Sequence, residues 1–340
     1  MTPRRSSPRP TTRTNRWAGR AAGLLAGVAA DALFGDPRRG HPVAGFGALA
    51  AALERRCYAD RHRAGVGYTA VLVGGVVGLG VLADRLAGPR PLARTALTAA
   101  ATWAVLGGAS LAGEGAALAG ELDRADLTAA RSRLPSLCGR DPSTLDASGI
   151  ARAGVESLAE NTSDAVVAPL FWGAVAGVPG LLGYRAVNTL DAMVGYRSPR
   201  YARFGWASAR LDDAANLLPA RAAALLFAGL APAVGGSPGA ALAAWRRDGV
   251  THPSPNAGPV EAAAAGALGV RLGGLTVYSH GAEQRPSLGT GEPPQVGDLH
   301  RAARLSRLVG WASAGLAAAG AHTAARRATR RHGGGSAGRS

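Results

Sequence analysis

The chain has 340 residues, of which 47% are hydrophobic and 5% aromatic, and its formal net charge is +16. All 38 basic residues are arginine, so the chain lacks both the lysine of a phosphate-binding P-loop and the amine of a Schiff-base enzyme. Two cysteines, Cys57 and Cys138, make neither a metal-binding pair nor a disulfide framework.

The positive charge is concentrated at the two ends of the chain. Six arginines fall within the first twenty residues, and five more follow Ala325. We expect a disordered Arg-rich arm over residues 1–20, a membrane domain over 21–325 and a basic Gly/Ser-rich tail over 326–340. Basic ends beside a membrane are typical of cytoplasmic anchors. Because aromatic residues are few and no binding motif is present, we expect no nucleic-acid partner.

Six stretches approach the roughly 20 apolar residues that a membrane helix needs. They begin at Trp17, Gly65, Ala96, Ala165, Leu217 and Leu308. The stretches from Gly65, Ala165 and Leu217 carry the strongest signal. The sequence therefore predicts an all-α, polytopic integral membrane protein with four to six transmembrane helices, joined by polar helical loops. The alternative is a soluble helical protein with buried Ala-rich helices, because small residues pack closely in either setting.

Two polar regions separate these stretches. Residues 121–164 alternate charge with Leu and Ala at near-helical spacing, which predicts amphipathic helices. Residues 246–300 are rich in Pro, Gly and His, which predicts mostly loop.

Three carboxylates precede the fourth apolar stretch at a spacing of four residues. Glu156, Glu160 and Asp164 would share one face of a helix, where like charges repel by a few tenths of a kcal/mol. A Mg²⁺ ion would offset that repulsion, since Mg²⁺ takes one or two carboxylates together with substrate phosphates. An ordinary solvated helix face is the equal alternative.

A second polar cluster follows in "YRAVNTLDAMVGYR". Asn188 and Asp191 lie one helical turn apart, and Arg185 and Arg197 flank them. Arginine offers a planar fork for phosphate or carboxylate. The alternative is a capped turn between two helices.

A third cluster contains the adjacent residues Asp212 and Asp213. On a helix they diverge by about 100°, so we expect only one of them to share a site with Asn216. Arg210 stands nearby, and ordinary charge at a helix N-terminus is the alternative.

Two loops carry further polar residues. Asp31, Asp36 and His41 lie in "DALFGDPRRGHPVAGFG", where a metal site competes with simple hydrogen bonding. Asn256 precedes an Ala-rich helix, and its position favours either an anion site at free backbone N–H groups or an ordinary capped helix.

Six linked stretches together resemble the adenosylcobinamide-phosphate synthase family, over roughly Ala21 to Gly320. They are "GDPRRGHPV", "ESLAENTSDAVVAPLFW", "YRAVNTLDAMVGYR", "YARFGWASARLDDAANLLPAR", "SPNAGPVEAAAAGALGVRLGG" and "PSLG". The chain departs from the family pattern at Ala165, Ala192 and Pro259, where Gly, Ser and Trp are usual. Ala192 removes any role for a hydroxyl at that point.

The resemblance implies an ATP-dependent ligase of cobalamin biosynthesis in the bacterial cytoplasmic membrane, with membrane lipid around it and other enzymes of the pathway as candidate partners. Such an enzyme joins the corrinoid adenosylcobyric acid to an aminoalcohol phosphate, typically (R)-1-amino-2-propanol O-phosphate. Activation of the carboxylate implies ATP as co-substrate and Mg²⁺ to neutralise its phosphates.

The same resemblance implies roles for the clustered residues. The expected catalytic set is Glu156, Glu160, Asp164, Asp191, Asp212 and Asp213. Within it, Glu160, Asp164 and Asp191 are the expected metal ligands, and one carboxylate is the base. The expected substrate-binding residues are Asn161, Asn188, Arg185, Arg197, Arg210, Asn216 and Asn256. The rival hypotheses are a transporter for a corrinoid or another anion, and a non-catalytic scaffold. A transporter would place acids inside the spans.

Overall fold

The computed structural model describes residues 12–333 except for 38–39, 197 and 279–280. The elements follow the chain as α1 (Thr12–Phe34), α2 (Pro42–Cys57), α3 (His62–Ala87), α4 (Pro91–Val105), α5 (Gly108–Asp123), α6 (Leu127–Arg133), α7 (Ala147–Thr162), a π-helical turn (Ser163–Val167), α8 (Ala168–Ala176), α9 (Val178–Val194), α10 (Trp206–Leu230), α11 (Pro238–Asp248), α12 (Ala257–Leu268), β1 (Leu272–Tyr278), β2 (Gly281–Leu288) and α13 (Val296–Gly333). The expected all-α class is confirmed, and parts of both expected arms are helical.

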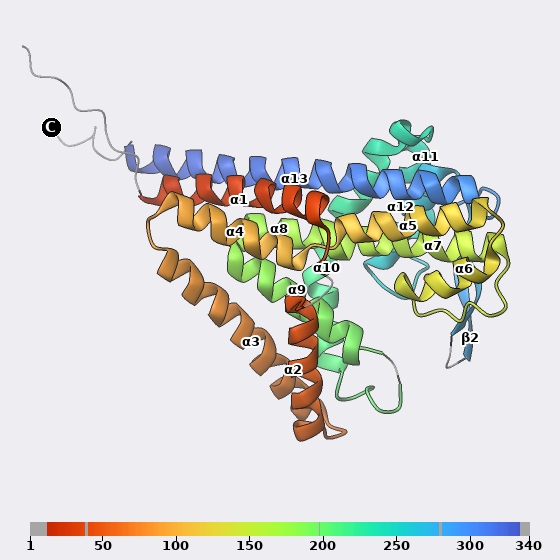
Figure 1. Cartoon of the computed structure of the whole chain (residues 1–340), viewed down its shortest axis with the longest axis horizontal. Helices are drawn as coiled ribbons and strands as arrows, with labels where there is room; N and C mark the ends of the chain where they lie inside the picture. The colour runs from red at the N-terminus through yellow and green to blue at the C-terminus, as the bar shows by residue number, and fades with distance from the viewer. Residues whose placement is uncertain (1–11, 38–39, 197, 279–280, 334–340) are drawn as a thin grey trace, which may run out of the picture.

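The longest helix, α13, runs beside α1 and then over α5 and α7, whereas α3 slants away from this bundle toward α2 (Figure 1). Small residues let α1 and α4 approach closely. A Cβ on Gly23 would lie 2.5 Å from Cβ of Thr98, and one on Gly27 would collide with Thr102 in the same way. This repeat of glycines one turn apart is the packing device of many membrane helix pairs.

Three helical stretches among the described residues are long and apolar enough to cross a membrane: His62–Ala87, Pro91–Asp123 and Trp206–Val234. Large apolar side chains on α3 face outward, with Val71, Leu79 and Leu86 each more than 60% exposed. These features define an all-α membrane protein, and the stretches from Gly65, Ala96 and Leu217 fall within the three helical stretches.

The count of three is below the expected four to six, and the stretch from Ala165 is the main reason. Gly177 adopts a φ of +70° there and separates α8 from α9. Before this break the stretch contributes only residues 165–176 to a helix that continues from α7, a rise of about 18 Å, too short for a hydrocarbon core of about 30 Å. The stretches at Trp17 and Leu308 lie in α1 and α13, which are less apolar than the three candidate spans.

The expectation that residues 246–300 are mostly loop was wrong. They contain α12, the antiparallel hairpin β1–β2 and the start of α13. The hairpin pairs Leu272 with Leu288 and Gly274 with Arg285, with an irregularity between Leu272 and Gly274. Gly273 permits this irregularity, because its φ is +84° and a Cβ there would strike the carbonyl oxygen of Pro286.

Every residue of α12 is buried, in the largest core of the protein, where α5, α7, α10 and α13 also contribute. Alanine and glycine make this possible, because a Cβ on Gly266 would strike the backbone of α11 at Ala240. The helix therefore carries Glu261 into the interior.

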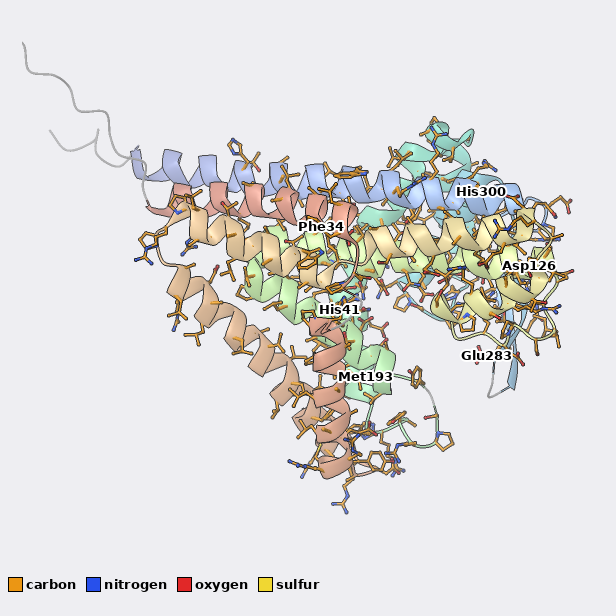
Figure 2. All side chains as sticks on the ribbon, in the orientation of Figure 1. Phe34, His41, Asp126, Met193, Glu283 and His300 are labelled. Carbon is orange, nitrogen blue, oxygen red and sulfur yellow. The ribbon has the colours of Figure 1, made fainter. Side chains whose placement is uncertain are left out.

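Figure 2 shows two further regions of this framework. His41 lies at the start of α2 near the turn that follows Phe34, and Met193 lies on α9 beside α2. Glu283 lies on β2, in the hairpin at the lower right of this view.

Candidate active site

Two adjoining cavities lie among α7, α9, α10 and the segment before α12. The larger lobe has a volume of about 1080 Å³ and the smaller lobe about 400 Å³. Both are lined by Gly139, Glu160, Asp164, Asp191 and Tyr196. All six expected catalytic carboxylates line at least one lobe, so residues from three separate helices meet in one place.

A proline shapes the helix that carries Glu160 and Asp164. Pro169 has no N–H to donate to the carbonyl of Ala165, and the N–H of Gly107 occupies that oxygen instead, at 3.3 Å. Just before it, the N–H of Ala168 bonds to the carbonyl of Ser163, which is π-helical pairing. Such a π-turn inside an α-helix is frequent at functional sites. Here it places Ser163 and Asp164 on the wall of the larger lobe.

The shared carboxylates crowd one another. Glu160 is exposed to the cavity but enclosed by protein on most sides, and burial raises its pKa, with Arg285 partly opposing the rise. Burial also raises the pKa of Asp164 well above its usual value, and the carboxylate of Asp212 adds to the rise. Burial, followed by the charges of Asp212 and Asp213, raises the pKa of Asp191 to about 7. A cation or a proton held among these groups would relieve the repulsion.

A chain of hydrogen bonds fixes Asp212. Asn216 Nδ2 donates to Asp212 Oδ2 at 2.9 Å, and Asn188 Nδ2 approaches Asp212 Oδ1 at 3.5 Å. Tyr184 OH donates in turn to Asn216 Oδ1 at 2.8 Å. Both asparagines, expected to bind substrate, thus hold a carboxylate in this structure.

Asp213 lies on the same wall despite the expected divergence of the two acids, since both line the larger lobe with Asn216. Only Asp212 bonds to Asn216. Asp213 instead forms an ion pair of 3.5 Å with the exposed Arg210, and its carbonyl oxygen accepts from Asn256 Nδ2 at 2.8 Å.

Asn256 joins α10 to the start of α12. Its Oδ1 accepts from Arg221 Nη1 at 2.9 Å, while Ser254 Oγ accepts from the N–H of Ala257 at 3.1 Å. Asn256 and Ser254 line the larger lobe. The N-terminus of α12 therefore points its positive end at the cavity that holds the acids.

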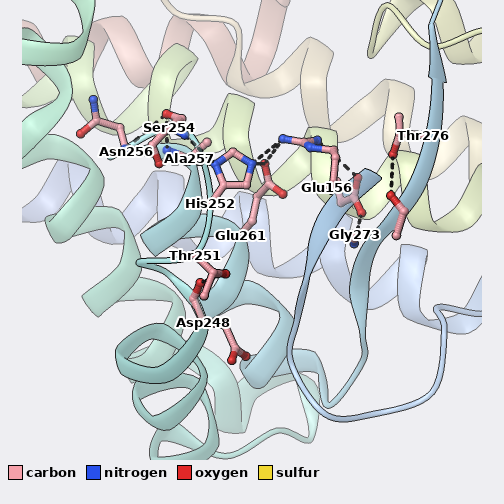
Figure 3. A network of polar contacts seen from close by, with 12 residues as sticks. Glu156, Asp248, Thr251, His252, Ser254, Asn256, Ala257, Glu261, Gly273 and Thr276 are labelled. Carbon is pink, nitrogen blue, oxygen red and sulfur yellow. Dashed lines mark hydrogen bonds and ion pairs between the residues drawn. The ribbon is translucent and has the colours of Figure 1, made fainter. Parts of the chain in front are cut away.

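Glu156 belongs to a buried network of charges (Figure 3). Its Oε2 accepts from Arg140, its Oε1 accepts from the N–H of Gly273 at 2.7 Å, and it is 2% exposed. Arg285, on β2, lies 3.8 Å from Glu156 Oε2 and 3.5 Å from Glu261 Oε1. These partners make Glu156 a positioning residue that holds Arg140 and Arg285 at the wall of the smaller lobe.

His252 completes that network as a neutral ring. Its Nε2 lies 2.6 Å from Arg285 Nη2, which can only donate, so Nε2 must accept. Burial and the charge of Arg285 lower the pKa of His252 to about 4. Glu261 lies 3.9 Å from the same nitrogen, and burial raises its pKa well above the usual value.

Sequence reasoning missed four members of this network: Arg140, His252, Glu261 and Arg285. Glu261 lies in the stretch "SPNAGPVEAAAAGALGVRLGG", which carries the resemblance, and His252 lies two residues before that stretch, which was the available signal. Arg140 and Arg285 lie in segments with no local pattern, so only long-range contacts reveal them.

Other expected site residues contribute less directly. Asn161 lines the smaller lobe, yet its Nδ2 donates to the carbonyl of Ser157 at 2.9 Å. Arg185 lines neither lobe, and burial lowers its pKa although Asp36 and Asp164 lie near enough to oppose this. Arg197 lies outside the described residues.

The loop from Asp31 to His41 is structural in its described contacts. Asp31 Oδ2 accepts from the N–H of Ala109 at 3.0 Å and so binds the first turn of α5. His41 Nδ1 accepts from the N–H of Val43, and its Nε2 lies 3.6 Å from Asp36. Asp31 Oδ1 and Asp36 Oδ1 are buried without a hydrogen-bond partner, so these contacts satisfy only part of the motif.

A magnesium site needs more than the protein supplies. Across the described part of the chain, no three His, Cys, Asp or Glu side chains converge closely enough to hold a metal ion alone. The carboxylates of Glu160 and Asp164 are nevertheless hard oxygen donors whose mutual repulsion a cation would relieve. This set fits a Mg²⁺ that arrives with substrate phosphates and takes its remaining ligands from them.

Fold and site together define a helical membrane protein with an acid-lined cavity among α7, α9 and α10. Residues 24–306 match the family described as CobD/Cbib protein. Proteins called "Cobalamin biosynthesis protein CobD" are 58% identical in Mycobacterium tuberculosis (88% of this chain, 96% of that one), 44% in Rhodobacter capsulatus (84% and 93%) and 46% in Geobacter metallireducens (78% and 85%). No solved structure matches the chain. The chain belongs to the CobD/Cbib family.

Proposed function

We propose that this protein acts in cobalamin biosynthesis as an amide-bond-forming synthase of the cytoplasmic membrane. It would join adenosylcobyric acid to (R)-1-amino-2-propanol O-phosphate, or to a related aminoalcohol phosphate, and give adenosylcobinamide phosphate. The observation that carries the proposal is the meeting of six carboxylates, Arg210 and the start of α12 around one open cavity of about 1080 Å³. The names of the relatives supply the pathway.

The reaction needs activation, because a carboxylate and an ammonium do not condense spontaneously in water. A carboxylate oxygen of the corrinoid attacks the γ-phosphorus of ATP, and ADP leaves. The amine, after losing one proton, attacks the acyl carbon; the C–N bond forms and the C–O bond to phosphate breaks. Inorganic phosphate leaves, and the nitrogen gives up a second proton to become the amide. The site must therefore bind phosphates and accept protons.

The residues divide these tasks. Glu160 and Asp164 would hold Mg²⁺ together with the phosphates of ATP. The ion would neutralise the negative charge of those phosphates. We assign Asp191, expected as a third metal ligand, to proton acceptance, because its pKa of about 7 suits a base near neutral pH. Asn188 and Asn216 hold Asp212 in place.

Phosphate binding falls to the opposite wall of the larger lobe. Arg210 is the cationic side chain there, and the N-terminal end of α12 adds the partial positive charge of its dipole, although the N–H groups of Ala257 and Gly258 already donate to Ser254. Asp213 and Asn256 connect the two through their contacts with Arg210 and with the backbone of α10. Arg185 lies too deep to contact a ligand in the lobes. Its positive charge would instead stabilise the ionised carboxylate of Asp164 through an electrostatic interaction.

Washed membranes that contain the protein test the proposal. They would receive adenosylcobyric acid, aminopropanol phosphate and Mg-ATP, and the corrinoid mass would be followed. A gain equal to the amine minus water, dependent on ATP and on the protein, is the expected result. Absence of that product under all combinations of substrates would reject the synthase.

Transport remains the second candidate because of one observation. Asp212 and Asp213 lie inside the apolar stretch Trp206–Val234, whereas the synthase reading expected acids between the spans. Acids within a membrane helix often mark a translocation path. Corrinoid uptake into sealed vesicles, with no change in its mass, would favour this function.

Ser163 provides a test of ligand contact in the larger lobe. Its Oγ is buried without a hydrogen-bond partner, and the residue is 2% exposed. An unsatisfied buried hydroxyl costs stability, so Ser163→Ala is expected to leave the melting temperature equal or higher. Loss of a ligand bond is expected to lower kcat/KM about tenfold.

Ser306→Ala is the matched control for that variant. Ser306 is equally buried, but its Oγ lies 2.6 Å from Thr162 Oγ1 and outside both lobes. We expect the opposite pattern, a lower melting temperature and unchanged kcat/KM. A Ser163→Ala variant that loses stability and keeps full activity would contradict the ligand contact.

A further inference from the structure

The two lobes differ in size and in charge. The smaller lobe, at about 400 Å³, is lined by Arg140 and Arg285 as well as by acids. The larger lobe, at about 1080 Å³, carries Arg210, Ser254 and Asn256 on its wall and is open to the surface. A reaction between a large corrinoid, ATP and a small amine needs sites of such unequal size.

We propose that the smaller lobe binds the phosphorylated amine, while the larger lobe receives the carboxylate substrate and the nucleotide. This inference deepens the proposed function and rests on it. It identifies the chemical class of the small ligand as a zwitterion with an ammonium group at one end and a phosphate at the other.

The side chains of the smaller lobe match both ends of that molecule. Arg140 and Arg285 bring positive charge for a phosphate, and guanidinium groups bind phosphate through paired hydrogen bonds. Asp191, which is not assigned to Mg²⁺, brings negative charge for an ammonium.

The boundary between the lobes is the place where the two substrates must meet. Glu160, Asp164 and Asp191 line both lobes, together with Gly139 and Tyr196. An amine whose phosphate lies beside the arginines would direct its nitrogen toward this boundary. The acyl carbon would then approach from the larger lobe, so that the C–N bond forms at the shared wall.

The hairpin supports the arginine side of the lobe. Arg285 is carried on β2, and the N–H of Gly273 on β1 bonds to Glu156, the partner of Arg140. Arg152 Nη2 also donates to the carbonyl of Leu275 at 3.0 Å. The hairpin, which the sequence did not predict, therefore forms the side of the smaller lobe that contacts the phosphate of the amine substrate.

A matched pair of alanines tests the division. Ala192 lines only the smaller lobe, and Ala209 lines only the larger one. Ala192→Leu places a larger side chain in the smaller lobe. It is expected to raise the KM for aminopropanol phosphate about tenfold, which corresponds to about 1.4 kcal/mol of binding free energy, and to leave the KM for ATP unchanged. Ala209→Leu is expected to raise the KM for ATP or corrinoid and to spare that for the amine. The reverse pattern would overturn the assignment.

Thiol protection gives a readout that needs no turnover. Cys138 lines the smaller lobe, whereas Cys57 packs beside the separate core of α2 and α3, so Cys57→Ala leaves one reporter thiol. Aminopropanol phosphate alone is expected to slow alkylation of Cys138 by iodoacetamide, and ATP alone is not. Protection without any product would uphold the subsite while rejecting the synthase. Product formation with protection by ATP and not by the amine would reject the subsite while upholding the synthase.

Discussion

Replacing Asp191 with Asn is expected to lower the rate of amide formation by about 100-fold or more, because a positioned general base contributes roughly 10² to 10⁴. The carboxylate must be ionised to accept the ammonium proton. Its pKa is about 7 without a metal ion, and Mg²⁺ on Glu160 and Asp164 would lower it, so the rate in the wild-type protein should rise with pH at or below that value. Initial rates of corrinoid mass gain between pH 5.5 and 8.5 measure both effects.

Stability should respond to the same substitution in the opposite direction. The pKa of Asp191 is raised in the folded state, so its ionisation opposes folding as pH rises from about 4 toward about 7. In metal-free buffer, Asp191→Asn should therefore melt higher than the wild type at pH 8, and the two should converge at the acid end of this window. That pattern separates a lost base from a misfolded variant.

Two further variants test whether the loss of activity comes from the carboxylate of Asp191. A Cβ on Gly195 would collide with Asp191 Oδ1, so Gly195→Ala should displace the carboxylate and reproduce the loss of activity. Asp60→Asn removes an exposed acid that pairs with Arg203, far from both lobes, and should leave activity intact. Near-normal turnover in both Asp191→Asn and Gly195→Ala would assign the base to another carboxylate.

Replacing Arg140 with Met is expected to destabilise the protein by about 3–5 kcal/mol, because it leaves a buried carboxylate without its main partner. The side chains of Arg140 and Glu156 are 6% and 3% exposed, so water from the smaller lobe can replace the lost partner only in part. Unfolding in mixed detergent micelles, followed by circular dichroism, measures the change in the free energy of unfolding.

A double variant distinguishes this cause from simple loss of packing. Arg140→Met with Glu156→Gln removes the buried charge and keeps an oxygen for the N–H of Gly273, so most of the stability should return. Arg203→Met breaks an exposed ion pair of 3.4 Å and should cost less than about 1 kcal/mol. Equal losses in the single and double variants would show that volume, and not charge, controls this region.

The sequence alone was sufficient for the all-α class, the membrane-like helices and the three polar clusters. The reason is that these features depend on local spacing. Glu156, Glu160 and Asp164 recur every four residues, and both lobes have members of this set on their walls. The apolar stretches from Gly65 and Leu217 likewise lie in long apolar helices. A run of about 20 apolar residues is long enough to form a membrane-spanning helix, so the sequence alone reveals it.

Local spacing was misleading for one apolar stretch, because the backbone geometry at a glycine decides where its helix ends. The stretch from Ala165 looked continuous, yet the positive φ of Gly177 divides it into α8 and α9. A pattern of small residues does not reveal such a break, since glycine is equally common inside close-packed membrane helices.

The assembly of the site was decided only by the tertiary structure. Arg140 and Arg285 are far apart in the chain and have no periodic signal, but both contact Glu156 in the interior. Asn188 and Asn216 looked like ligands for substrate, and their hydrogen bonds instead go to Asp212. Burial of charge requires partners from wherever the fold can bring them, and those partners are a property of packing that local sequence does not encode.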